Sequence, residues 1–258
     1  MKRISTRSGE LDVNIISAMG SPSGLLPGAT GASASNSPLV VFCHGFGAPG
    51  TDLVPLAGEL VALSPALAAN TYAFPAGPID LTSIGLYGGR AWFPIDMQAL
   101  DLANRAGRID VLAASEPAGM GAARKKLRTA IEALMGGRPW SQVILGGFSQ
   151  GAMMALDLAL RLEEAPAAVI AFSPTLVDRA SWERAAALRK GLRVFISHGR
   201  QDPLLPIRGT EALVALLSAA GVAVDYLPFD GPHTIPFEAL ERAALLLEGL
   251  MDSTSSGT

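Results

Sequence analysis

The stretch VILGGFSQG, residues 143–151, guides the interpretation of the whole chain. An apolar run at 143–145 leads through two glycines to Ser149, and residues 152–162 then have the pattern of a helix. A serine between a strand and a helix, flanked by Gly147 and Gly151, predicts a sharp turn that exposes the hydroxyl above a sheet. A glycine-rich turn with an incidental serine has the same pattern, so the surrounding residues must distinguish the two.

The composition is that of an apolar globular chain. The 258 residues suit a single domain, 1–258, with 49% hydrophobic and 17% charged residues. The net charge of −3, with scattered basic residues, argues against a nucleic-acid partner. Residues 1–13 lack the apolar core of a secretory signal, and no apolar run is long enough to span a bilayer. The one cysteine, Cys43, excludes an internal disulfide, so we expect a cytoplasmic protein.

Apolar segments alternate with helical patterns along the chain. Strands are predicted near residues 11–15, 39–43, 71–74, 143–145, 168–172, 193–197 and 222–228. Helices are predicted near residues 52–64, 97–108, 117–135, 152–162, 181–190, 208–220 and 236–251. This alternation predicts an α/β fold with a mainly parallel sheet and helices on both faces. We expect a flexible loop or hairpin at 20–38, an irregular connection at 75–96 and a disordered tail at 252–258.

Three histidines are available as a base for the serine. A serine hydroxyl is a poor nucleophile unless a histidine accepts its proton, and a carboxylate normally orients that histidine. In α/β-hydrolases the chain order is serine, acid, histidine, which favours His233. His44 lies upstream of Ser149, and we expect His198 to be a structural residue that bonds the backbone.

The predicted acid is Asp202, which follows a strand and precedes a proline that fixes the turn. Three other aspartates are alternatives: Asp178 follows the preceding strand, Asp225 lies within a predicted strand, and Asp230 is close to His233 in the sequence. The histidines have no metal-ligand spacing and no cysteine cluster accompanies them, so no metal is predicted.

Two backbone N–H groups are candidates for an oxyanion hole. In this kind of fold one donor is the residue after the nucleophile, here Gln150. The other comes from the turn after an earlier strand, and in HGFG at 44–47 it is most simply Phe46. Glycines in that turn would let the backbone approach the substrate.

Taken together, these segments resemble the carboxylesterase and phospholipase family of serine α/β-hydrolases, which includes acyl-protein thioesterases and lysophospholipases. The similar segments are CHGFGAPG at 43–50, AWFPI at 91–95, VILGGFSQGAMMAL at 143–156, VIAFSP at 169–174, ISHGRQDPLLP at 196–206 and DGPHTIP at 230–236. The resemblance implies an α/β-hydrolase fold and a triad of Ser149, Asp202 and His233. It also implies oxyanion donors at Phe46 and Gln150, and no metal or cofactor.

The resemblance further implies a substrate class. Family members cleave carboxylic esters and in some cases thioesters, so we expect a serine esterase that acts on short to medium acyl chains. A lysophospholipase or acyl-protein thioesterase for long chains, an amide hydrolase and a non-catalytic acyl-ligand binding protein are the alternatives. Trp92 and Phe93 resemble residues that line the family's acyl site, although a core role competes. Acyl length, leaving group and oligomeric state stay open, and a homodimer and a lipid substrate are both compatible with the composition.

Overall fold

A computed structural model describes residues 1–18, 37–108 and 111–255 of the chain. Within these residues, eight strands form one sheet in the order β1-β2-β4-β3-β7-β8-β9-β10. Its antiparallel edge consists of β1 (Lys2–Ser8) and β2 (Leu11–Ser17). The parallel strands are β4 (Thr71–Pro75), β3 (Leu39–Cys43), β7 (Val143–Phe148), β8 (Ala168–Phe172), β9 (Arg193–Gly199) and β10 (Ala223–Phe229). The predicted α/β fold with a mainly parallel sheet is confirmed.

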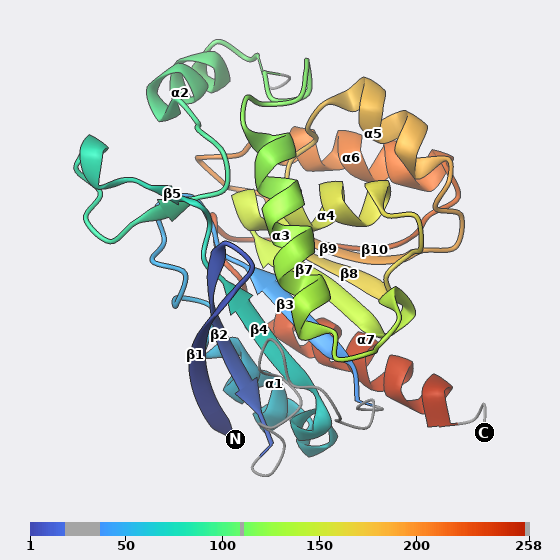
Figure 1. The fold of residues 1–258 in the computed structure, drawn as a ribbon. Helices are drawn as coiled ribbons and strands as arrows, with labels where there is room; N and C mark the ends of the chain where they lie inside the picture. Colours follow the sequence, from blue (N-terminus) through green and yellow to red (C-terminus); the bar gives the residue numbers. More distant parts are fainter. Residues whose placement is uncertain (19–36, 109–110, 256–258) are drawn as a thin grey trace.

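Helices cover both faces of the sheet (Figure 1). One face carries α3 (Met120–Leu134), α4 (Gln150–Arg161), α5 (Arg179–Ala186) and α6 (Ile207–Ala219), and the other carries α1 (Leu56–Leu63) and α7 (Phe237–Ser255). Successive residues of β3 serve the two cores in turn, because Val41 packs in the first cluster and Phe42 in the second. Among the described residues, no helix has the length and apolarity to cross a membrane.

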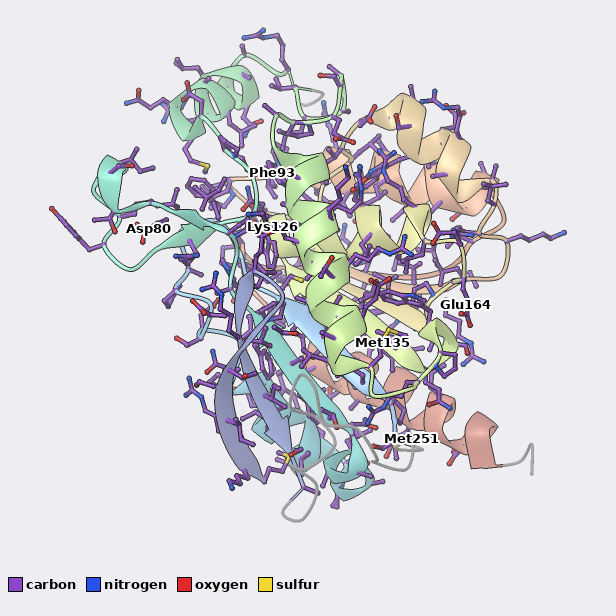
Figure 2. The ribbon with its side chains drawn as sticks, in the orientation of Figure 1. Asp80, Phe93, Lys126, Met135, Glu164 and Met251 are labelled. Carbon is purple, nitrogen blue, oxygen red and sulfur yellow. The ribbon has the colours of Figure 1, made fainter. Side chains whose placement is uncertain are left out.

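A smaller structure projects from the sheet (Figure 1). It contains the hairpin strands β5 (Ile79–Asp80) and β6 (Arg90–Ala91), the 3₁₀ turn η2 (Thr82–Ile84) and the helix α2 (Met97–Arg105). In Figure 2, Asp80 lies on this hairpin, and Phe93 lies where the chain returns toward the core. The sequence predicted the helix near 97–108, which α2 confirms, but only an irregular connection at 75–96, because strands of two residues are too short to show periodicity. Two further 3₁₀ turns are η1 (Pro65–Ala69) and η3 (Trp140–Gln142).

Two ends of the chain differ from the prediction. Strand β1 was missed because its sequence, KRISTRS, is largely polar and forms an exposed edge. The prediction of a disordered tail at 252–258 is wrong for residues 252–255, because α7 continues through Ser255. No proline follows Pro236 in the chain, and the one glycine within the helix, Gly249, does not end it. Residues 256–258, and 20–36 of the predicted loop, lie outside the described residues.

The strand register brings the carboxyl ends of the parallel strands to one edge. Cys43 of β3 pairs with Gly147 of β7, and Gly199 of β9 pairs with Phe229 of β10. The loops after these four strands therefore emerge side by side. This is the edge at which α/β folds bind their ligands, and it is where the predicted site residues lie.

Candidate active site

Ser149 occupies a strained turn between β7 and α4. Its backbone angles are φ 55° and ψ −119°, a conformation that L-residues rarely adopt. Two backbone hydrogen bonds hold it there: Ser149 N–H donates to Phe172 O at 2.8 Å, and Met153 N–H donates to Ser149 O at 3.1 Å. The predicted strand, sharp turn and helix are all present.

Gly147 and Gly151 give this turn its shape. A Cβ added to Gly147 would lie 2.5 Å from the carbonyl carbon of Gly151 and 2.6 Å from Cys43 O. A Cβ added to Gly151 would overlap the same Cys43 carbonyl group even more closely. Because β3 and α4 approach backbone to backbone here, any side chain at either position would push them apart. The prediction that these glycines make room for the turn is confirmed.

Asp202 lies in the turn after β9 and is almost fully buried. Its Oδ1 accepts hydrogen bonds from the N–H groups of Leu204 and Leu205, both at 2.9 Å. Its Oδ2 lies 2.5 Å from His233 Nδ1 and 3.2 Å from His198 Nε2. Burial opposes ionisation, but the hydrogen bonds from the two histidines and from the backbone outweigh it and hold the pKa of Asp202 well below its usual range. Asp202 is therefore a carboxylate.

His233 reaches Asp202 from the loop after β10. The two loops pack closely because residue 199 is a glycine, since a Cβ there would overlap the carbonyl oxygens of Gly231 and Pro232. The imidazole also packs against Phe148, with ring centroids 4.7 Å apart. His233 is thus held between the acid and the residue that precedes Ser149.

Ser149 and His233 line one cavity of about 110 Å³. The remaining lining residues are mostly apolar: Gly45, Phe46, Ile95, Met97, Leu100, Phe148, Gln150, Met153, Leu204 and Leu205. Met153 and Leu205 are buried, whereas Leu204 is 45% exposed, so the buried pair forms the inner wall and Leu204 lies at the mouth. The structure therefore brings Ser149, Asp202 and His233 together beside an apolar cavity.

The two predicted oxyanion donors also face this cavity. Phe46 lies in the turn after β3, which is fixed on both sides: Gly47 N–H donates to Arg90 O at 2.9 Å, and Ala48 N–H donates to Gly45 O at 3.3 Å. Gln150 is the first residue of α4, and the first N–H groups of a helix have no carbonyl partner within it. Both positions could therefore present an N–H to a substrate oxygen.

Trp92 and Phe93 lie behind Gln150 and have no exposed surface. The Gln150 side chain accepts a hydrogen bond from Trp92 N–H at 2.9 Å and donates one to Phe93 O at 2.7 Å. Trp92 Nε1–H donates to His44 O at 2.9 Å. The predicted direct contact of these two side chains with a substrate does not appear in this geometry, because neither belongs to the described cavity wall. The competing core role accounts for both, and the tryptophan ties the two oxyanion turns together.

The other histidines and aspartates have different partners. His44 Nε2 accepts a hydrogen bond from Gly77 N–H at 2.8 Å, and burial lowers the pKa of His44, so its imidazole is neutral. His198 Nε2 lies 2.8 Å from Leu205 O, which confirms the expected backbone bond. Asp178, Asp225 and Asp230 form ion pairs with Arg161, Arg242 and Arg200, respectively.

The sequence analysis missed most of the cavity wall and one contact of the acid. Met153 was identifiable, because it lies four residues after Ser149 on the same face of α4. Leu204 and Leu205 directly follow the acid and could also have been proposed. The contact between His198 and Asp202 depends on how the turn after β9 folds back, which no residue pattern indicates.

The sheet, the strained serine turn and the loop positions of the acid and histidine define an α/β-hydrolase. A model of the phospholipase/carboxylesterase family matches residues 30–249 of the chain. The chain therefore belongs to this family of ester hydrolases, as its sequence motifs predict.

Two similar proteins are named acyl-protein thioesterase 1. The one from Kluyveromyces lactis is 32% identical over 189 residues, which cover 71% of this chain and 78% of the relative. The one from Eremothecium gossypii is 28% identical over 234 residues, which cover 87% of this chain and 92% of the relative. Among solved structures, esterase PE8 superposes with a TM-score of 0.70 at 28% identity, covering 97% of this chain and all of that one.

Proposed function

We propose that this chain is a serine esterase that hydrolyses carboxylic esters through an acyl-enzyme. Ser149 is the nucleophile, His233 the general base and Asp202 the residue that orients the base. The observation that carries the proposal is the 2.5 Å contact between Asp202 Oδ2 and His233 Nδ1, beside a cavity that Ser149 and His233 share. With Nδ1–H donated to the carboxylate, Nε2 is the nitrogen that accepts the serine proton.

The reaction follows from these positions. Ser149 Oγ attacks the acyl carbonyl while His233 Nε2 takes its proton, and the carbonyl oxygen becomes an oxyanion that accepts from Phe46 N–H and Gln150 N–H. The imidazolium then protonates the leaving alcohol, and the acyl group stays on Ser149. A water molecule, deprotonated by His233, releases the acid and restores the serine.

The cavity supports short acyl chains as preferred substrates. Its volume is about 110 Å³, well below the roughly 300–1,000 Å³ of pockets that bury drug-sized ligands, so it suits a short chain better than a long one. The wall is mostly apolar, which suits hydrocarbon. A longer chain would extend past the mouth at Leu204.

Thioesters are the second candidate substrate. Two similar proteins carry the name acyl-protein thioesterase, and a thioester presents the same acyl group and carbonyl to Ser149. Comparing oxygen and sulfur esters of one acid would separate the two activities, because the acyl contacts would be identical.

The cysteine content supports a cytoplasmic location for this reaction. Cys43 is buried at the end of β3, and burial raises the pKa of its thiol, so it is an unreactive core residue. The chain has no other cysteine, so a reducing compartment would break no internal crosslink.

Ser149→Ala tests the proposal. We expect p-nitrophenyl butyrate turnover to fall by roughly three to six orders of magnitude, because no other group replaces the nucleophile. A fluorophosphonate probe should label the wild type and not the variant, which separates an enzyme from a binding protein of the same fold. Near-wild-type turnover in the variant would overturn the assignment, and a series of esters from two to twelve carbons would establish the acyl preference.

A further inference from the structure

The side chain of His198 contacts the carboxylate of Asp202. His198 is the second-last residue of β9 and has no exposed surface. Its Nε2 lies 2.8 Å from Leu205 O and 3.2 Å from Asp202 Oδ2. A carbonyl oxygen and a carboxylate oxygen can only accept hydrogen bonds, so Nε2 must carry a proton and donate it. The single Nε2–H therefore lies between Leu205 O, the shorter contact, and Asp202 Oδ2, so two imidazoles approach one oxygen of the carboxylate.

The ring of His198 is fixed on its other side as well. Its Nδ1 lies 2.7 Å from the hydroxyl oxygen of Thr210 on α6, and that hydroxyl lies 2.5 Å from Pro174 O in the loop after β8. The imidazole therefore cannot rotate without breaking contacts with two other elements. Its Nε2 is thereby held within 2.8 Å of Leu205 O and 3.2 Å of Asp202 Oδ2.

We propose that His198 is a positioning residue for ester hydrolysis, which fixes the Asp202 oxygen that His233 requires. The terminal torsion of an aspartate is broad, so a carboxylate with donors on one side alone would turn easily. Here two backbone N–H groups hold Oδ1 while His198 and His233 share Oδ2. With His198 in place, Oδ2 stays at its 2.5 Å distance from His233 Nδ1. The inference rests on the proposed triad.

Two substitutions of His198 separate positioning from packing. His198→Gln can present an amide N–H near the place of Nε2, whereas the shorter side chain of His198→Asn cannot reach Asp202. We expect kcat of His198→Asn to fall roughly 10- to 100-fold, the scale of a small misplacement, with KM little changed. His198→Gln should keep most of kcat.

Ser197→Ala is the matched control for disturbing β9. Ser197 is the buried neighbour of His198, and its hydroxyl has no hydrogen-bond partner among the described residues. We expect wild-type kcat in this variant. A similar loss in Ser197→Ala, an equal loss in His198→Asn and His198→Gln, or wild-type kcat in His198→Asn would each overturn the proposal.

Nuclear magnetic resonance provides a readout independent of turnover. The low-field proton of His233 Nδ1 should move in His198→Asn and stay in His198→Gln. If His198→Asn does not fold, ¹⁵N-histidine spectra of the wild type decide: a protonated, hydrogen-bonded His198 Nε2 supports the proposal, and an unprotonated one overturns it. Failure of the esterase assignment would show separately, as turnover that survives in Ser149→Ala.

Discussion

The two sides of the candidate site are built by different forces. On the nucleophile side, the turns after β3 and β7 meet backbone to backbone, and glycines at 147 and 151 allow the approach to the Cys43 carbonyl. On the acid–base side, the loops after β9 and β10 are joined by hydrogen bonds to one buried carboxylate, Asp202. The first side depends on excluded volume, and the second on charge and proton position.

This difference determines how each side can fail. The tightly packed turn around Ser149 has no room for an added atom, but its packing does not depend on which polar groups lie nearby. A carboxylate that organises four donors tolerates little change in its own chemistry, because each buried donor needs its acceptor. Apart from Ser149 itself, substitutions of equal size should therefore affect mainly stability on the nucleophile side and mainly catalysis on the acid–base side.

Among the variants that compare the two sides, Asp202→Asn should produce the largest effect. The amide keeps the shape but can donate to His233 Nδ1, which then adopts the wrong tautomer to accept the serine proton. We expect kcat to fall about 10⁴-fold, equivalent to roughly 5.5 kcal/mol. Asp230→Asn is the control, because Asp230 is exposed and pairs with Arg200. Equal losses of kcat in the two variants would remove Asp202 from the mechanism.

Gly151→Ala should be next and should act on stability. Its Cβ would overlap the Cys43 carbonyl, so β3 and α4 must separate, at a cost of about 3 kcal/mol or more in the free energy of unfolding. Gly58→Ala is the matched control: Gly58 lies in α1 with open space around it, and alanine there should stabilise by about 0.5–1 kcal/mol. Urea unfolding measures both. A Gly151→Ala variant as stable as Gly58→Ala would contradict the steric account.

The same division explains what the sequence could predict. The nucleophile side could be predicted from the sequence. An apolar run followed by a serine between glycines is compatible with few conformations other than a sharp turn from a strand to a helix. Asp202 and His233 were predicted from chain order and loop position. Met153 and the two leucines after Asp202 could have been proposed from their places in the sequence, whereas the contact between His198 and Asp202 could not, because it depends on how the turn after β9 folds back. Trp92 shows the opposite error, since a motif placed near the substrate identifies a buried support.

His44 is a titrating group on the nucleophile side. Its contribution to the free energy of unfolding can be tested by measuring stability as a function of pH. Burial lowers the pKa of His44 in the folded chain, whereas an unfolded histidine takes up a proton near pH 6.5. As the pH falls below about 6.5, the unfolded chain therefore binds more protons, and the free energy of unfolding decreases by up to about 1.4 kcal/mol per pH unit. The loss continues until the lower folded pKa is reached.

His44→Gln should remove this contribution. Urea unfolding of wild type and variant at pH 8, 7, 6 and 5 measures it as a difference of slopes, so the other histidines cancel. We expect the variant to be less stable at pH 8, because it loses the ring contact between His44 and Trp92, whose centroids are 5.4 Å apart, and to lose less stability between pH 6.5 and 5. Parallel curves would mean that His44 does not supply the pH dependence.

Leu204→Ala should have the smallest effect of these substitutions. It separates the role of the Leu204 backbone from the role of its side chain on the acid–base side. Leu204 holds Asp202 through its N–H, whereas its side chain lies at the cavity mouth and is 45% exposed. Leu204→Ala keeps the N–H, so turnover of p-nitrophenyl acetate should be unchanged. For the hexanoate ester, which reaches the mouth, kcat/KM should fall about threefold to fivefold, the loss of one partly buried contact. Leu188→Ala, at a 76% exposed position outside the cavity wall, should change neither substrate. A comparable loss on acetate would show that the Leu204 side chain also helps to hold the carboxylate, and that the two sides differ less than their contacts indicate.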